Sequence, residues 1–185
     1  MTRLLTRRLV LRPWEERDRD LFYEINSDPL VMEFFPFRRN REEADAFLDH
    51  IMARQMERPT FQAIELAETG EGLGFCGLHQ AGVEPFFPAD TVEIGWRLTR
   101  HAWGHGYASE AAMAWLAHGF ETLGLEEIVS YAVFNNLRSM AVMDRIGMKP
   151  DPQRDFGHPT VPDTHPHLKR HVVYRMTAQQ WRQNR

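Results

Sequence analysis

The chain has 185 residues, 43% of them hydrophobic and 26% charged, which is typical of a single globular domain that can bury its own core. Acidic residues outnumber basic ones by 26 to 22, and the net charge of −4 argues against nucleic-acid binding through bulk positive charge. No apolar run approaches the ~20 residues of a membrane span, and arginines interrupt the start of the chain, so neither membrane insertion nor secretion is expected. We therefore expect one cytoplasmic domain over residues 1–185.

The first half of the chain alternates strand-like and helix-like segments. Apolar residues at helical spacing follow a short strand, and Asp28–Pro29 ends this first helix. Asn40 is a good N-cap for a second helix, which Arg58–Pro59 ends. A glycine-containing turn joins two further strands as a hairpin. The predicted elements are a strand at 9–12, a helix at 15–26, a helix beginning after Asn40, and strands at 61–66 and 73–81.

The second half continues with strands and helices in alternation. Gly124 and Gly147 follow two amphipathic segments and are typical C-terminal glycines of helices. This order of elements predicts an α+β fold with a mixed sheet, and not a doubly wound parallel sheet. The predicted elements are strands at 92–98, 128–134 and 168–176, helices at 110–123 and 136–146, and a short polar tail at 177–185.

The segment Trp103–Glu110 carries the clearest functional signal, because it is a small-residue turn between a predicted strand and a predicted helix. Gly104 and Gly106 allow close backbone approach to an anion, and the N-terminus of a helix adds about half a positive charge. The turn therefore predicts a phosphate or pyrophosphate site. Its spacing matches neither the dinucleotide-binding nor the P-loop pattern, so a Rossmann or Walker-type site is not expected.

Glu93 lies on the strand before this turn, where alternation places it on one face together with Gly95 and Arg97. A carboxylate screened from water can serve as a general base. A solvated edge residue or an ion pair with Arg97 is an equally good interpretation from the sequence. Glycine inside a strand often marks the close approach of another group.

Asn136 and Ser139 lie three residues apart at the start of the helix predicted at 136–146, so they share one helical face. An amide and a hydroxyl there suit a ligand that itself carries amides. An N-cap asparagine followed by a surface serine explains the same spacing.

Four blocks of the chain, taken together, resemble the GNAT superfamily of N-acetyltransferases. The resemblance is to the RimJ/RimL-like branch, the ribosomal-protein-alanine acetyltransferase type, and it extends from about Leu5 to Met176. Any one block alone is a weak signal, whereas the four in this order are specific. The blocks are Leu5–Pro13, Glu93–Trp96, Trp103–Ala108 and the late helix with its turn, Asn136–Met148.

The resemblance implies a mixed, mostly antiparallel sheet of six to seven strands with helices on both faces. It also implies that acetyl-CoA binds in a splay between the fourth and fifth strands, with no metal. Trp103 stands where the superfamily usually has arginine or glutamine, as is common in this branch. The implied cofactor contacts are the backbone of Trp96, Arg97 and Leu98 with the pantetheine, the N–H groups of Gly104, His105, Gly106, Tyr107, Ala108 and Ser109 with the pyrophosphate, and Asn136 with the pantetheine.

For the reaction, the resemblance implies direct acetyl transfer to a primary amine, either a protein N-terminus or a small molecule. Glu93 matches the general-base position, and Ser139 would lie near the thioester sulfur. Many relatives use a tyrosine to protonate the thiolate where this chain has Met143, so the acid is Ser139 or water. The alternatives are a catalytically silent acetyl-CoA-binding or sensing domain and an unrelated nucleotide-binding module.

Histidines and phenylalanines cluster in several connecting segments. His165 and His167 lie two residues apart in a proline-rich loop without a nearby cysteine, so polar loop residues are a better interpretation of these histidines than a metal site. The phenylalanines form either an acceptor pocket or the surface of a homodimer, with ordinary core filling as the simpler explanation. These residues are His158, His165, His167 and His171, and Phe34, Phe35, Phe37, Phe86 and Phe87.

Overall fold

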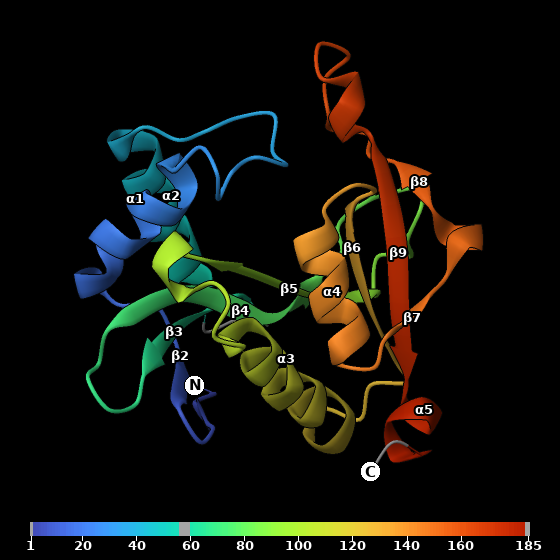
Figure 1. Ribbon diagram of the computed structural model, residues 1–185, viewed down its shortest axis with the longest axis horizontal. Helices are drawn as coiled ribbons and strands as arrows, with labels where there is room; N and C mark the ends of the chain where they lie inside the picture. Colours follow the sequence, from blue (N-terminus) through green and yellow to red (C-terminus); the bar gives the residue numbers. More distant parts are fainter. Residues whose placement is uncertain (1, 56–59, 184–185) are drawn as a thin grey trace.

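The computed structural model describes residues 2–55 and 60–183. Its strands form one sheet in the order β1-β2-β3-β4-β5-β6-β9-β7, and β8 pairs with β9 beside this path (Figure 1). Every pairing is antiparallel except that of β5 with β6. The strands are β1 (Leu4–Leu5), β2 (Leu9–Arg12), β3 (Gln62–Leu66), β4 (Gly72–Gln80), β5 (Val92–Leu98), β6 (Glu127–Val133), β7 (Lys149–Pro150), β8 (Phe156–Gly157) and β9 (Arg170–Thr177).

The α+β class and the mostly antiparallel sheet are confirmed. The described residues form nine strands where six or seven were expected, because three strands are only two residues long and carry no pattern that a sequence could show. The helices are α1 (Arg19–Ser27), α2 (Arg41–Arg54), α3 (Tyr107–Ala117), α4 (Leu137–Arg145) and α5 (Ala178–Gln183).

Helices α1 and α2 cover one face of the sheet. Their apolar residues, among them Phe22 and Leu48, pack on Ala63 of β3 and Phe75 of β4. Asn40 caps α2 as predicted: its Oδ1 accepts the Glu43 N–H at 2.9 Å, and the Glu43 carboxylate accepts the Asn40 N–H at 2.9 Å. The residues predicted to end this helix, Arg58 and Pro59, lie outside the described residues, and α2 is assigned up to Arg54.

Helix α1 begins four residues later than the sequence predicts. The carboxylate of Asp18 binds the guanidinium of buried Arg12 at 2.7 and 2.8 Å and accepts the N–H of Glu15 at 2.8 Å. These bonds hold residues 16–18 in a single 3-10 turn, after which the α-helix starts.

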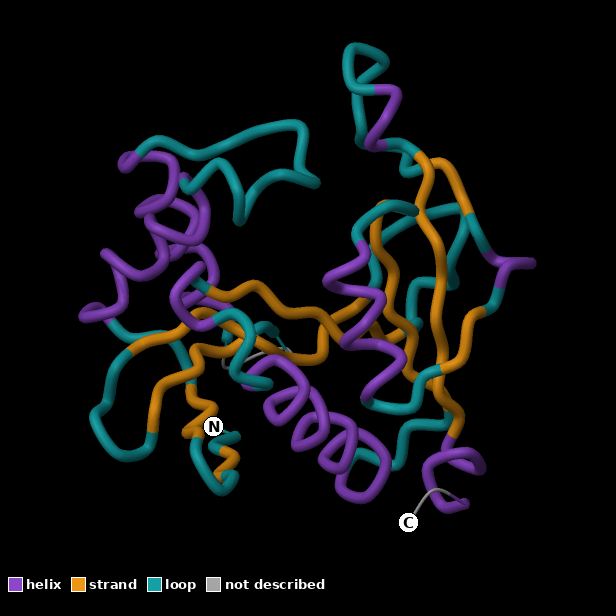
Figure 2. Tube along the Cα trace, in the orientation of Figure 1, coloured by secondary structure: helices purple, strands orange, loops and turns teal. Residues whose placement is uncertain are grey.

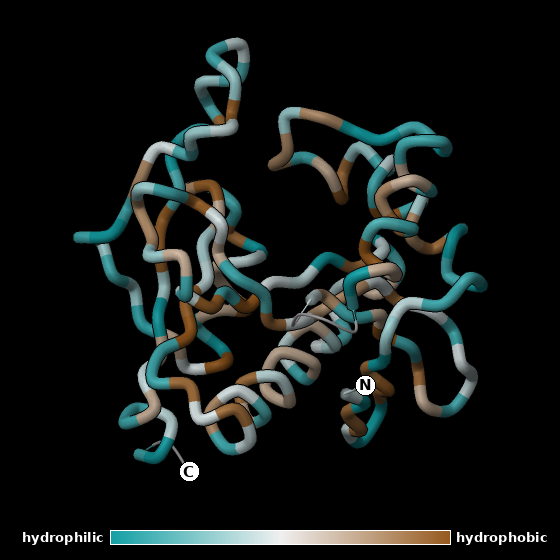
Figure 3. The backbone as a smooth tube through the Cα atoms, turned by 180° about the vertical axis from the view of Figure 1, so that it is seen from behind, coloured by the Kyte–Doolittle hydropathy of each residue, from teal (hydrophilic) through white to brown (hydrophobic). Residues whose placement is uncertain are grey.

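Helix α3 covers the opposite face, where Trp115 and Leu116 pack in the main core with Leu78 of β4 and Ile94 of β5. It starts at Tyr107, earlier than the predicted 110, and continues into a π-helical turn over His118–Thr122. The hydrophobic stretches follow the strands and α3, but the loop between α1 and α2 is also partly hydrophobic (Figure 3). Helices therefore lie on both faces of the sheet, as expected.

The C-terminal segment is not a polar tail, and this expectation was wrong. Residues 178–183 form α5, whose Trp181 is only 5% exposed and stacks on Phe120 with ring centroids 5.7 Å apart. Thr177 caps this helix, since its Oγ1 accepts the Gln180 N–H at 3.2 Å. One large aromatic residue anchors a segment that is otherwise polar.

We expect Trp181→Ala to lower the free energy of unfolding by about 3 kcal/mol, because the substitution leaves a cavity where a large buried ring was packed. Urea unfolding followed by circular dichroism measures this change. Arg182→Ala, an exposed neighbour in the same helix, should change it by less than about 0.5 kcal/mol. Equal effects of the two substitutions would contradict the anchoring role of Trp181.

Strands β5 and β6 separate soon after they meet. A single register pair, Glu93 with Val129, joins them, and Oγ of Ser130 donates to the carbonyl of Ile94 at 2.9 Å. Beyond this point β5 runs away from β6 and β9 (Figure 1). The expected splay between the fourth and fifth long strands is thereby confirmed.

The loop between α1 and α2 extends toward the C-terminal half of the molecule (Figure 2). Phe34 in this loop packs against Val133 and Leu168, and Glu33 binds Arg138 of α4 at 2.6 Å. These contacts connect the two halves of the sheet beside the splay.

Candidate active site

The turn before α3 has the geometry of an anion site. Gly104 and Gly106 adopt φ of 80° and 79°, a left-handed conformation that favours glycine. Within the described residues, none of the N–H groups of residues 104–109 donates to another group of the chain. These N–H groups and the positive end of α3 are therefore available to a phosphate.

Two arginines that the sequence did not mark approach this turn. The guanidinium of Arg8 lies 4.6 Å from the ring centroid of Tyr107, and its Nε binds Glu110 at 2.7 Å. Arg145 of α4 donates to Oγ of Ser109 at 3.0 Å. Burial raises the pKa of Glu110, but hydrogen bonds from Thr6 and Arg8 outweigh it and hold that pKa below its ordinary value. Both arginines come from distant parts of the chain, so no local pattern could reveal them.

Along β5, every second residue turns its backbone N–H and C=O toward the edge that faces the splay. Because the Ile94 carbonyl points to β6, alternation turns the N–H and C=O of Trp96 to the same edge. The backbone of Arg97 points instead to β4, where it is paired with Phe75. The carbonyl of Leu98 accepts the indole N–H of Trp103 at 3.0 Å. Of the three residues expected to pair with the pantetheine, Trp96 turns both backbone groups to the splay, whereas the carbonyl of Leu98 on the same edge is already taken.

Glu93 is buried, with 7% of its surface exposed, so it is not a solvated edge residue. It is not paired with Arg97 either, because Arg97 binds Asn26. Nε2 of His79 lies 3.0 Å from Oε2 of Glu93, but the ring is not aligned for a hydrogen bond, and this buried oxygen has no donor in the described chain. The carboxylate therefore has one oxygen free to accept a proton or an N–H.

Tyr131 of β6 is a second polar neighbour of Glu93 that sequence patterns did not indicate. Its hydroxyl donates to the carbonyl of Ala81 at 3.2 Å. Burial, and then the negative charge of Glu93, raise the pKa of Tyr131 above its ordinary value. The phenol therefore stays protonated beside the carboxylate at neutral pH.

Two of the four histidines, His158 and His171 of β9, lie together near this face, with ring centroids 4.9 Å apart. Burial lowers the pKa of both; for His158 the charge of His171 lowers it further, while that of Glu93 raises it. Nδ1 of His171 lies 3.0 Å from the carbonyl oxygen of Lys169. In the part of the chain that the structure describes, no group of three or more histidine, cysteine or acidic side chains is placed to hold a metal ion.

These lowered pKa values predict how stability depends on pH. Between the ordinary pKa of a histidine and the lower folded value, the unfolded chain binds more protons, so the free energy of unfolding falls as pH drops below about 6.5. His171→Asn should flatten this decline relative to the native chain, as followed by urea unfolding at pH 5 to 7.5. His167→Asn, an exposed site, is the control and should leave the slope as it is.

Gly95 faces a protein side chain and not open space. A Cβ atom at Gly95 would lie 2.9 Å from the ring of Phe61, and one at Gly77 of β4 would lie 2.8 Å from the Phe61 Cα. The Phe61 ring also packs on His79, with centroids 4.2 Å apart. The close approach signalled by Gly95 is that of Phe61, which forms a wall next to Glu93.

The late helix α4 carries the remaining candidates. Oδ1 of Asn136 accepts the Ser139 N–H at 3.1 Å, so the capping interpretation is confirmed and the Nδ2 group is left for other partners. Ser139 is half-buried in the first turn of α4. Met143 is 1% exposed and belongs to the main core, so it takes no part in the surface of the site.

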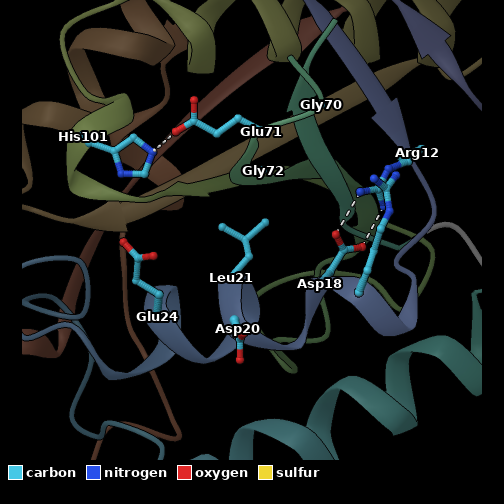
Figure 4. Close-up of a pocket in the computed structure, with 10 residues that line it drawn as sticks. Arg12, Asp18, Asp20, Leu21, Glu24, Gly70, Glu71, Gly72 and His101 are labelled. Atoms are coloured by element: carbon cyan, nitrogen blue, oxygen red, sulfur yellow. Dashed lines mark hydrogen bonds and ion pairs between the residues drawn. The ribbon is translucent and has the colours of Figure 1, made fainter.

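A pocket of about 350 Å³ lies away from Glu93, between α1 and the β3–β4 turn (Figure 4). Its charged groups are largely paired with one another: Arg12 with Asp18, and His101 with Glu71 at 3.1 Å. Such internal pairing leaves few groups for a substrate, so this pocket is not the candidate site.

The chain is similar to known acetyltransferases. A profile of the acetyltransferase (GNAT) domain matches residues 8–149. The chain is 33% identical to the uncharacterized N-acetyltransferase YnaD of Bacillus subtilis, with 79% of this chain and 82% of that protein covered. It is 31% identical to the FsC-acetyl coenzyme A-N(2)-transacetylase of Aspergillus fumigatus, with 78% and 64% covered. The chain therefore belongs to the GNAT acetyltransferase family, and it is an acyltransferase.

Solved structures agree with this assignment. A GNAT-family acetyltransferase from Bacillus anthracis superposes with a TM-score of 0.80 at 26% identity, covering 96% of this chain and 99% of that one. A structure described as a putative ribosomal-protein-serine acetyltransferase from Vibrio cholerae gives 0.75 at 18% identity, covering 95% and 97%, which shows the shared fold alone. Among the described helices, none has the length and apolar character needed to span a membrane.

Proposed function

We propose that this protein transfers the acetyl group of acetyl-CoA directly to a primary amine while both substrates are bound. The observation that carries the proposal is the buried Glu93 carboxylate with a donor-free oxygen, on the strand whose open edge borders the splay. A base so placed suits an ammonium group that must lose a proton before it reacts.

The N–H groups of residues 104–109 are proposed to hold the pyrophosphate, assisted by Arg8 and Arg145. Acetyl-CoA supplies the activated thioester. The unpaired N–H groups and left-handed glycines of this turn support the assignment. The Nδ2 group of Asn136, which the cap does not use, and the open backbone edge of Trp96 are both proposed to bind the pantetheine.

Glu93 is proposed to take the proton of the ammonium, directly or through a water. The N–H of Trp96 stabilises negative charge on the thioester oxygen as an oxyanion donor does. As the C–N bond forms and the C–S bond breaks, the nitrogen loses its second proton, and Ser139 or water passes that proton to the departing sulfur. Side-by-side placement of amine and thioester supplies much of the acceleration.

Within the family we propose a place near the RimJ/RimL-like branch, with a protein N-terminus or a small molecule as acceptor. The four matching sequence blocks support this. The structural neighbours described as ribosomal-protein acetyltransferases are too distant in sequence to support anything beyond the shared fold.

The test is thiol release from acetyl-CoA over a panel of amines and N-terminal peptides, with binding of CoA, ATP and NAD compared by calorimetry. We expect amine-dependent release and binding of CoA in preference to the other two. CoA binding without acetylation of any amine would indicate a silent binding domain. Preferential binding of ATP or NAD would contradict the cofactor assignment.

A further inference from the structure

Two arginines on the Glu93 side of the sheet, Arg97 and Arg39, have no acidic partner within the part of the chain that the structure describes. Arg97 projects from the same face of β5 as Glu93, four residues further on, which corresponds to about 13 Å along a strand. Its guanidinium lies 4.3 Å from the ring centroid of Phe35 and 5.3 Å from that of Phe75. The rings belong to the α1–α2 loop and to β4, so this side chain lies on the face covered by α1 and α2.

The polar contacts of Arg97 leave part of its guanidinium unsatisfied. One terminal nitrogen donates to Oδ1 of Asn26 at 2.8 Å, whereas the buried Nε has no partner in the described chain. Burial, and then the charge of Arg39, lower the pKa of Arg97 to about 9. The cation is half-buried, with its Nε shielded from solvent, and its hydrogen bond in the described chain is to one neutral amide.

Arg39 repeats this arrangement beside it. Its guanidinium reaches the same Asn26 oxygen at 3.5 Å and lies 4.7 and 4.3 Å from the ring centroids of Phe37 and Phe47. Burial lowers the pKa of Arg39 as well, although Glu43 raises it.

Buried Arg12 provides the contrast within the same protein. It binds the carboxylates of Asp18 and Glu65 at 2.7 and 2.8 Å. For Arg97 and Arg39, no ion pair within 4.0 Å is found in the described residues. A partly buried cation without a counter-ion loses part of its hydration free energy, and a bound anion offsets that loss.

We propose that Arg97, with Arg39 beside it, binds the carboxylate of the acceptor, so that the substrate is a short peptide or amino-acid derivative carrying both an amine and a free carboxylate. This inference rests on the proposed function, because it places the amine at Glu93. A fork of guanidinium N–H groups suits a carboxylate. Polyamines, which would bring a second cation to two arginines, are disfavoured by repulsion.

The geometry favours the acceptor over the cofactor as the source of the anion. Arg97 lies on the face of the sheet that α1 and α2 cover. The turn over residues 104–109, proposed to bind the pyrophosphate, precedes α3, which covers the opposite face. Glu93 and Arg97 lie about 13 Å apart along the strand, and the Phe61 ring covers Gly95 between them. A peptide of at most about four residues that joins the two side chains therefore has to pass over the Phe61 ring.

The experiment compares product peptides in pairs, so that it does not depend on turnover. N-acetylated alanine peptides of one to four residues, each as the free acid and as the C-terminal amide, are titrated by calorimetry into the CoA-loaded protein. We expect the acid of the best length to bind roughly 10- to 100-fold more tightly than its amide. In Arg97→Met this preference should disappear, and in the exposed control Arg38→Met it should persist.

If Arg97→Met does not fold, a second variant tests whether Arg97 binds the carboxylate. Phe35→Glu places a carboxylate next to Arg97 and should abolish the preference for acids through internal pairing. Equal binding of acid and amide by the native protein, or no binding of the acid, overturns the inference. Weaker CoA binding by Arg97→Met with an unchanged acid preference also overturns it, because the arginine would then serve a cofactor phosphate.

Turnover separates this inference from the proposed function. Peptide acids acetylated faster than their amides and faster than spermidine support both. Tight binding of the acids without acetylation of any amine leaves the carboxylate site standing and contradicts the transferase proposal. Equal acetylation of acids, amides and spermidine supports the transferase and contradicts the carboxylate site.

Discussion

Replacing Glu93 with glutamine is expected to lower kcat by roughly 100- to 10,000-fold near neutral pH, which is the range that general-base catalysis supplies. Glutamine keeps the shape of the side chain but cannot accept the proton of an ammonium group. The deficit should shrink as the pH rises, because the amine then loses its proton to solvent. CoA affinity should stay within about twofold, since the residue lies on the acceptor face.

Thiol release measured from pH 6 to 10, with calorimetry for CoA, tests this expectation. Glu68→Gln in the exposed β3–β4 turn removes the same charge away from the site and serves as the matched control. If Glu93→Gln turns over like the native protein, Glu93 is not the base.

Ser109→Asp is expected to weaken CoA binding by about 100-fold. The new carboxylate would stand among the N–H groups proposed for the pyrophosphate, and two negative charges ~5 Å apart repel by about 3 kcal/mol at an effective dielectric constant of ~20. The same carboxylate in the first turn of α3 should stabilise the helix by about 0.3 to 1 kcal/mol, since it complements the helix dipole and lies near Arg145.

The opposite signs of these two effects make the test specific. Ser109→Asn keeps the size and removes the new charge, so it should bind CoA within a few fold of the native protein. Calorimetry gives the affinities, and urea unfolding gives the stabilities. Undiminished CoA affinity in Ser109→Asp would place the diphosphate elsewhere.

Local signals in the sequence were sufficient for several parts of the fold and site. The capping box of Asn40 and Glu43 and the glycine turn at 104–106 each depend on residues within one or two turns of chain. The face shared by Glu93 and Arg97 follows from strand alternation alone. The expectations of a mixed, mostly antiparallel sheet and of a splay, which came from the family resemblance, were confirmed.

Other features could not be read from the sequence because distant segments create them. Arg8 joins the phosphate turn through Glu110, and Tyr131 and His171 reach the Glu93 side from β6 and β9. The C-terminal helix was mistaken for a tail because its one anchoring residue, Trp181, gives no periodic pattern. Gly95 indicated that another group packs closely against β5, but the sequence did not show that this group is the Phe61 ring.

The sequence by itself determined the class of fold, the turn that opens α3 and the identity of the acidic side chain before it. The tertiary structure decided that Glu93 is buried and has one carboxylate oxygen without a hydrogen-bond donor in the described chain. It also decided that the neighbours of Arg97 are aromatic rings and an amide, whereas a buried arginine usually pairs with a carboxylate. The physical reason is that helix, strand and turn preferences act over a few neighbouring residues. Desolvation and charge pairing depend on which strands and loops pack together.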